Sequence, residues 1–150
     1  MPDDSPTHPL TRDEFDLVSE LAFAIAESTG AGDAERHQDA VRLMREWIAA
    51  LRGKYGEHPV LLETLADFED DVAVQIPLYA DACERAVSLG LPTVSIRLAL
   101  AGVLLDGRGD VEGASAQLEA GERELAGEGA DSDQREDLEE LRARCRAGRK

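Results

Sequence analysis

The stretch PTVSIRLALAGVLLDGRGDVEGASAQLEAGEREL, residues 92–125, decides the fold of this chain. Apolar residues recur in it at steps of three and four up to Leu105, stop at a pair of glycines, and resume after Asp110. This spacing gathers side chains on one face of an α-helix. Glycine ends helices, and aspartate caps the start of the next one. The stretch therefore predicts two antiparallel helices, from about Pro92 to Leu105 and from Asp110 to about Leu125.

The same pattern continues on both sides of this pair and predicts five further helices. Thr11-x-x-Glu14 has the form of a capping box and predicts the start of the first of them. The other expected boundaries are a stop at Gly30, a cap at Asp33, a start at His58-Pro59, Pro77 in a first turn, and a stop at Gly90. The last helix carries one narrow apolar stripe, formed by Leu138, Leu141 and Cys145. A single stripe is typical of a helix whose outer face meets water at the end of a stack.

Together these segments predict an all-α fold of about seven helices, with antiparallel hairpins stacked side by side and a C-terminal capping helix. Alternation of period two, which would indicate strands, is absent. At 150 residues the chain fits one domain. We expect a flexible lead-in over residues 1–10 and a single helical domain over residues 11–150.

The helix pair also resembles a tetratricopeptide repeat, whose pattern is W-x2-L-G-x2-Y followed by A-x3-F. The matching residues here are Leu98-x2-Ala101-Gly102-x2-Leu105 and Ala114-x3-Leu118. The resemblance covers residues 57–127 well and 11–55 weakly, with aliphatic residues at the usual aromatic positions. It implies that Gly102 lets the two helices of a unit approach closely. A helical bundle without repeats is the alternative.

Charge and composition exclude several classes of function. The chain has 32 acidic and 16 basic residues, a formal net charge of −16, so nucleic acid would be repelled. No run approaches the roughly 18 apolar residues of a membrane span, and the N-terminus lacks a signal peptide, which predicts a cytoplasmic protein. Cys83 and Cys145 are interpreted as ordinary buried thiols. The basic residues of 142–150 are interpreted as cations that complement a helix C-terminus.

No residue pattern indicates catalysis. His8, His37 and His58 stand in separate segments, outside any metal-ligand spacing. Nucleophile, phosphate-loop and dinucleotide motifs are absent. We therefore expect no enzyme, no cofactor and no metal site.

The resemblance does imply a binding surface, because the first helix of each tetratricopeptide unit lines a concave groove. Carried over to this sequence, the groove positions are Ile96, Ala99, Val103 and Asp106 in one unit, and Val60, Glu63, Asp67, Asp70 and Asp71 in the preceding one. The spacing of Glu63, Asp67, Asp70 and Asp71 predicts that these carboxylates share one helical face. An acidic strip beside an apolar one suits a basic partner segment. The alternative is a solvated acidic face.

Three functions follow as hypotheses. The first is an adaptor or scaffold that binds a basic protein segment in the groove. The second is a dedicated immunity or chaperone protein that neutralises one basic protein. The third is a structural module that forms homodimers through exposed apolar residues of the N-terminal hairpin.

Overall fold

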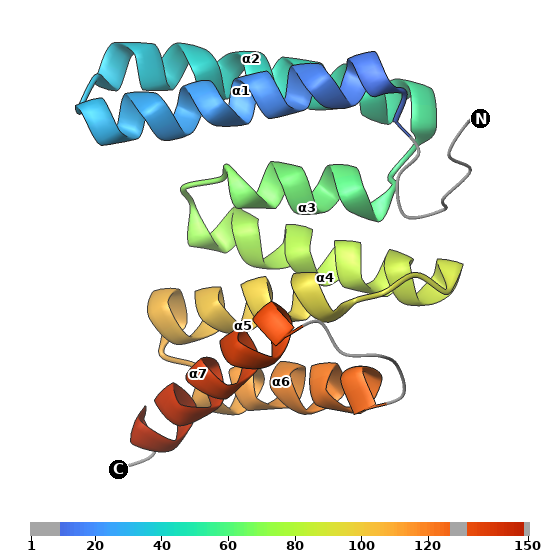
Figure 1. The fold of residues 1–150 in the computed structure, drawn as a ribbon, viewed down its shortest axis with the longest axis vertical. Helices are drawn as coiled ribbons and strands as arrows, with labels where there is room; N and C mark the ends of the chain where they lie inside the picture. The colour runs from blue at the N-terminus through green and yellow to red at the C-terminus, as the bar shows by residue number, and fades with distance from the viewer. Residues whose placement is uncertain (1–9, 127–131, 149–150) are drawn as a thin grey trace. The chain divides into compact units, whose positions relative to one another are not determined.

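The computed structural model describes residues 10–126 and 132–148, and in this part of the chain the fold is all-α, as predicted. Figure 1 shows the seven helices in chain order. They are α1 (Arg12–Ala31), α2 (Ala34–Tyr55), α3 (Pro59–Asp67), α4 (Val72–Leu89), α5 (Val94–Arg108), α6 (Val111–Ala126) and α7 (Ser132–Gly148). Apart from Leu10, which is buried, the predicted lead-in lies outside the described residues. No described helix is both long enough and apolar enough to cross a membrane.

The chain divides into two compact units, unit 1 (Met1–Phe68) and unit 2 (Glu69–Lys150). In unit 1, α1 and α2 form an antiparallel hairpin, and α3 packs against α2 (Figure 1). In unit 2, α5 packs against α4, α6 and α7. The boundary falls between α3 and α4, inside the second predicted hairpin, so a single domain over 11–150 stays a prediction.

The predicted caps are present at the helix starts. The Thr11 hydroxyl accepts a hydrogen bond from the Glu14 backbone N–H at 3.2 Å, and the Glu14 carboxylate accepts one from the Thr11 N–H at 2.8 Å, which completes the capping box. Asp33 caps α2 through the Arg36 N–H. His58 caps α3, with its Nδ1 atom accepting from the Val60 N–H at 3.2 Å. These starts are local signals, readable from a few adjacent residues.

The Glu14 carboxylate also ties the start of α1 to the end of α2. It accepts hydrogen bonds from the Lys54 ammonium at 2.8 Å and from the Tyr55 hydroxyl. The side chain is only 11% exposed. The hydrogen bonds from Lys54 and Tyr55 lower the pKa of Glu14 from 4.5 to about 2. One carboxylate therefore serves as helix cap and as clamp between two helices.

Three helix boundaries differ from the prediction, and one of them is the end of α5, which runs past Leu105 and through Gly107 to Arg108. The first helix passes through Gly30 and ends at Ala31, because Gly32 takes the left-handed conformation, with φ at 69°, and receives the capping role. Pro77 lies inside α4 and not in its first turn, because Asp71 caps the helix and starts it at Val72. The proline is tolerated at this position because its side chain is exposed. Water can therefore hydrogen-bond to the backbone carbonyl that would otherwise accept from the N–H group that proline lacks.

Replacement of Pro77 by alanine is expected to stabilise unit 2 by about 1–2 kcal/mol. Proline in a helix interior removes a hydrogen bond and crowds the preceding turn, at a cost of roughly 3 kcal/mol, and its rigidity in the unfolded chain offsets part of that cost. Thermal unfolding followed by circular dichroism measures the change. Pro92→Ala, outside the helices, is the matched control. An unfolding midpoint for Pro77→Ala at or below that of the wild type would contradict the expectation.

The core of unit 2 follows the predicted packing positions with one exception. Ala101, Ala114 and Leu118 are at most 2% exposed and cluster with the stripe of α7. Gly102 does not have the role that the resemblance implied. A Cβ atom placed on it would meet nothing within 4 Å. Close helix approach therefore rests on the two alanines and not on this glycine.

Candidate functional site

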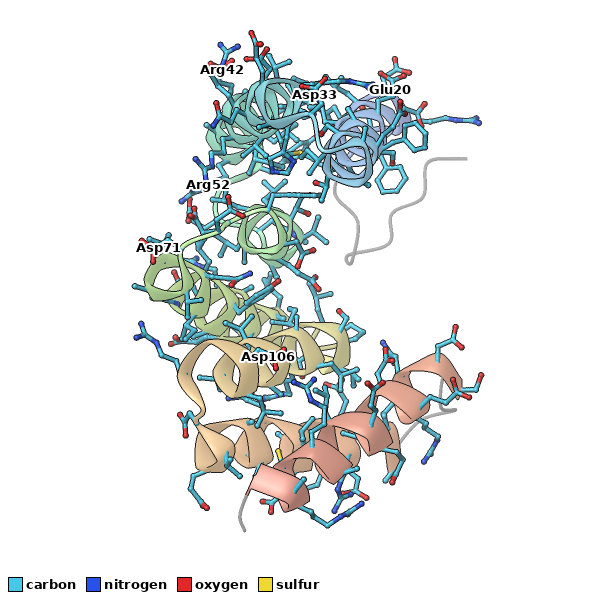
Figure 2. All side chains as sticks on the ribbon, turned by 90° about the vertical axis from the view of Figure 1, so that its left-hand side faces the viewer. Glu20, Asp33, Arg42, Arg52, Asp71 and Asp106 are labelled. Carbon is cyan, nitrogen blue, oxygen red and sulfur yellow. The ribbon has the colours of Figure 1, made fainter. Side chains whose placement is uncertain are left out.

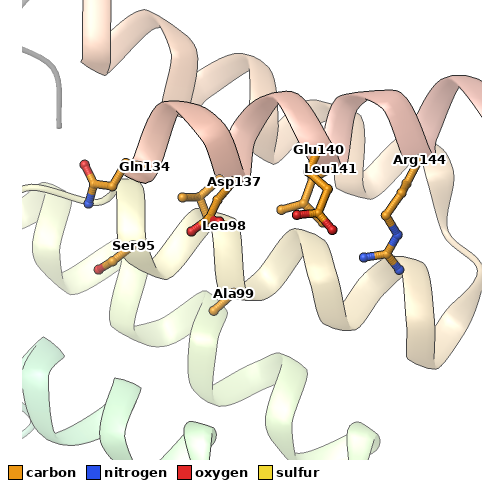
Figure 3. Close-up of a pocket in the computed structure, with 8 residues that line it drawn as sticks. All are labelled: Ser95, Leu98, Ala99, Gln134, Asp137, Glu140, Leu141 and Arg144. Carbon is orange, nitrogen blue, oxygen red and sulfur yellow. The ribbon is translucent and has the colours of Figure 1, made fainter. Parts of the chain in front are cut away.

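An open groove of about 420 Å³ lies between α5 and α7 in unit 2. In Figure 3, side chains of α7 project toward those of α5 across this space. The lining residues are Ser95, Leu98 and Ala99 from α5, and Gln134, Asp137, Glu140, Leu141 and Arg144 from α7. The groove combines an apolar floor with carboxylates along one wall.

The α5 wall arises from a helix with two buried sides. Val94 and Ala101 pack against α6 and α7, and Leu100 is buried as well. Between the buried positions, Ser95 and Ala99 are spaced four residues apart and fall on one outward strip. Because both side chains are small, the strip leaves room above the helix. The groove thus owes its depth on this side to short side chains.

The α7 wall arises from a helix with one buried stripe, as predicted. Leu138 and Cys145 are each 3% exposed and anchor the helix to the core, while Leu141 is half-buried at the edge. Asp137 and Glu140 follow the turn beside this stripe and are exposed. The stripe therefore fixes the direction in which the two carboxylates point.

A carboxylate from α6 fixes the start of α5. Thr93, the residue at the cap position, makes no capping hydrogen bond with its own side chain. Instead, Glu124 accepts hydrogen bonds from the Thr93 N–H and hydroxyl and from the Val94 N–H, each at 3.0 Å. Arg97 completes the network by donating to the Thr93 hydroxyl at 2.8 Å and to Gln117 at 2.9 Å. Free amide groups at the first turn of α5 are thus satisfied from the neighbouring helix.

Cations of α7 occupy part of the acidic surface around the groove. Arg144 pairs with Asp106 of α5, and Arg142 pairs with Glu122 of α6. Asp106 is labelled in Figure 2, near the end of α5. The two pairs link α7 to both helices of the adjacent hairpin. Two of the basic residues expected to complement a helix end, Arg142 and Arg144, therefore form defined ion pairs, while Arg149 and Lys150 lie outside the described residues.

Of the groove positions predicted on α5, the structure places one on the groove wall. Ala99 lines the groove, Val103 is half-buried, and Asp106 is exposed in its pair with Arg144. Ile96 is 3% exposed, so its side chain belongs to the core and cannot be reached by a partner.

The predicted acidic strip does not lie on one helical face. Glu63 and Asp67 belong to α3, which ends at Asp67, and Asp70 lies between two helices. Asp71 caps α4 by accepting a hydrogen bond from the Ala73 N–H at 3.0 Å. The spacing rule failed because it assumes an unbroken helix. Val60, the remaining predicted position, is half-buried on α3.

Sequence reasoning missed the whole α7 wall. Gln134, Asp137, Leu141 and Arg144 recur at steps of three and four, and this spacing is a signal present in the sequence. We interpreted the single apolar stripe of the last helix only as the end of a helical stack. That interpretation did not consider the neighbouring face of the same helix, which lines the groove.

Unit 1 has a separate apolar pocket of about 310 Å³ between α1 and α2. Its lining residues are Leu17, Leu21, Leu43, Glu46 and Trp47. Leu43 is 46% exposed, and the Trp47 indole N–H donates to the Glu14 backbone carbonyl at 3.4 Å. The pocket offers apolar contact and a single carboxylate.

Among the described residues, no group of three or more His, Cys, Asp or Glu side chains is arranged to hold a metal ion. His37 Nδ1 lies 2.9 Å from the Thr29 hydroxyl, and His58 caps α3. Cys83 and Cys145 are free, buried thiols, and burial raises the pKa of Cys83. Each described histidine thus has a hydrogen-bond partner in the fold, and each cysteine is packed in the interior.

Comparison with protein-family models, with curated proteins and with solved structures finds no match to this chain. The function must therefore be argued from the site.

Proposed function

We propose that this chain is a cytoplasmic, non-catalytic binding protein of tetratricopeptide-like type, which holds a basic segment of a partner protein in the α5–α7 groove. The observation that carries the proposal is the position of Asp137 and Glu140 beside the apolar floor formed by Leu98 and Leu141. Carboxylates at a rim attract cationic side chains, and an apolar floor retains the side chains next to them.

The dimensions favour a segment over a whole folded surface. A groove of about 420 Å³ has the volume of a pocket that receives one or two large side chains. It is open, so the chain that carries those side chains can continue past either end. A short segment with Leu, Met or Phe next to Lys or Arg fits this description.

Arg144 indicates how a bound cation would be held. Its guanidinium already pairs with Asp106 at the edge of the groove. An arginine of the partner can approach Asp137 and Glu140 in the same way, since guanidinium and carboxylate match in geometry. The net charge of −16 adds a long-range attraction that raises the rate of encounter.

Selection from a display library of random peptides tests the proposal directly, because a random library covers basic, acidic and uncharged segments alike. We expect enrichment of peptides in which Lys or Arg flanks an apolar residue, with affinity that falls as salt rises. For an enriched peptide, the Asp137→Lys/Glu140→Lys variant is expected to bind at least tenfold more weakly, a loss of about 1.4 kcal/mol. Fluorescence anisotropy of the labelled peptide measures both effects.

The matched control is Glu136→Lys/Glu139→Lys, which makes the same change of charge on the same helix at exposed positions outside the groove lining. Its affinity should stay within about threefold of wild type, because these two side chains lie outside the groove lining and are exposed to water, which weakens their attraction for a bound cation. Equal losses in both variants would mean that total charge, not the groove, governs binding. Enrichment of acidic or uncharged peptides would overturn the proposal.

The same assay separates a scaffold from a dedicated neutraliser. A scaffold binds many enriched peptides weakly. A neutraliser needs one folded basic partner, with an association rate that depends steeply on salt.

A further inference from the structure

Arg144 lines the groove between α5 and α7 and already pairs with a carboxylate there. Its guanidinium forms an ion pair with Asp106, and the two side chains are 43% and 67% exposed. A guanidinium of the chain itself is thus bound at one end of a groove for which a basic partner segment is proposed. The inference that follows rests on that proposed function.

We propose that Arg144 determines how many cations the groove accepts from its partner. The groove has two positions that can hold a cation. Asp137 and Glu140 form the first, and within residues 10–126 and 132–148 neither of these side chains is in an ion pair. Asp106 forms the second, and Arg144 fills it. The preferred partner therefore carries a basic residue on only one side of its apolar residue.

The spacing along the two helices places the second position at one end of the groove. On α5, Asp106 follows Ser95 and Ala99 at eleven and seven residues' distance, which puts all three on one side of the helix. On α7, Arg144 follows Asp137 at seven residues' distance, about 10 Å along the helix axis. Figure 3 shows Arg144 at one end of the row of α7 side chains. The two cation positions are therefore separated along the groove.

The end of α5 favours a cation at Asp106. This residue lies in the last turns of the helix, which ends at Arg108. The backbone carbonyl groups at a helix C-terminus carry partial negative charge, which adds to the charge of the carboxylate. Arg108 is two residues further along and projects from the opposite side of the helix. On the groove side of α5, the cation beside Asp106 is therefore Arg144.

The ion pair removes the benefit of a second basic residue in the partner. A second arginine of the partner reaches Asp106 only by displacing Arg144. This exchange forms one guanidinium–carboxylate pair and breaks an equivalent one, so it adds little to the affinity. A second arginine that stays beside the intact pair meets the positive charge of Arg144. In either case the wild-type groove gains little from it.

Two labelled peptides with capped ends test the inference. The first has one arginine next to a leucine in a glycine–serine sequence. The second has a further arginine on the other side of the leucine, about three residues from the first. This spacing spans about 10 Å, because an extended chain rises roughly 3.3 Å per residue. Fluorescence anisotropy measures the affinity of each peptide, and the readout is the ratio of the two affinities, from which any change that affects both peptides alike cancels.

Wild type should bind the two peptides with affinities within about threefold of each other, the remainder reflecting long-range attraction that salt screens. Arg144→Gln leaves Asp106 free, so its ratio in favour of the second peptide should be at least about fivefold higher than that of wild type. In the Asp106→Asn/Arg144→Gln variant, the ratio should return to the wild-type value because the freed carboxylate is gone.

Arg142→Gln is the matched control. Arg142 pairs with Glu122 of α6, is 34% exposed and does not line the groove between α5 and α7. The variant thus removes the same charge from the same helix and leaves Asp106 paired. Its ratio should equal that of wild type, and all variants should keep the helical circular dichroism spectrum.

Equal ratios in wild type and Arg144→Gln would overturn the inference. An equal rise in Arg142→Gln, or a rise that persists in Asp106→Asn/Arg144→Gln, would do the same, because the effect would then not come from Asp106. If neither peptide binds to any of these proteins, the proposed function itself is wrong, and this inference with it. A failure of the function and a failure of the inference alone therefore give different results.

Discussion

The Glu124→Ala variant is expected to lose about 2–4 kcal/mol of unfolding free energy from unit 2. Its carboxylate holds the Thr93 N–H, the Thr93 hydroxyl and the Val94 N–H. Thr93 is 2% exposed, so water cannot replace the lost acceptor. Each buried donor left without a partner costs roughly 1–3 kcal/mol, and the costs of neighbouring groups are not additive.

The two buried cysteines provide the measurement, since both lie in unit 2. Cys83 is 8% exposed and Cys145 is 3% exposed, so a thiol reagent reaches them only when unit 2 opens. The rate of thiol labelling across a denaturant series therefore reports the stability of this unit. Glu119→Ala, an exposed change on the same helix, should shift stability by less than about 0.5 kcal/mol. If the thiols of the two variants are labelled at the same rate, the hydrogen bonds from Glu124 to the start of α5 do not contribute to the stability of unit 2.

The second large effect is expected at Glu14, where loss of the charge should cost unit 1 about 2–3 kcal/mol near neutral pH. The carboxylate receives hydrogen bonds from Thr11, Lys54 and Tyr55, and charged hydrogen bonds of this kind contribute roughly 1.5–3 kcal/mol. Glu14→Gln keeps the shape and removes the charge. Trp47, the one tryptophan of the chain, lies in unit 1, and its fluorescence follows unfolding there.

The effect has a defined pH dependence. The pKa of Glu14 is about 2 in the folded chain and 4.5 when unperturbed. A lowered pKa stabilises the folded state fully above the unfolded value, and this stability is lost as pH falls from about 4.5 toward 2. The difference between wild type and Glu14→Gln should therefore shrink over that window. Glu20→Gln, on the exposed side of α1 (Figure 2), should show no such convergence. A constant difference at all pH values would contradict the assignment.

The sequence predicted the features that local signals determine. The capping box at Thr11, the cap at Asp33 and the stripe of α7 each depend on residues a few positions apart, and all three are present. The start of α5 was less readable, because the group that caps it comes from residue 124, thirty-one residues further along the chain. No window of local sequence contains both partners.

Of the predicted groove positions, only Ala99 lines the groove between α5 and α7. The resemblance located α5 as one wall and Ala99 on it, but it carried over Ile96, which packs into the core. A repeat pattern aligns sequence positions but does not fix how the helix is rotated about its axis. An error of one position moves a side chain to another face of the helix. The wall formed by Asp137 and Glu140 depends on how α7 crosses α5, a tertiary property that spacing alone does not encode.

The empty space above Gly102 would make the proposed binding surface adjustable. Gly102 follows Ser95 and Ala99 on the same side of α5, at seven and three residues' distance, and a Cβ atom there meets nothing within 4 Å. Glycine in a helix interior costs about 1 kcal/mol relative to alanine, so a larger residue here would strengthen the helix and at the same time raise the floor beside the groove. Substitution of Gly102 by alanine, valine and leucine in turn would thus fill more of the space beside the groove at each step, while the helix becomes more stable than with glycine. If the proposed binding is correct, a single site that leaves the core untouched would in this way change which side chains the groove accepts.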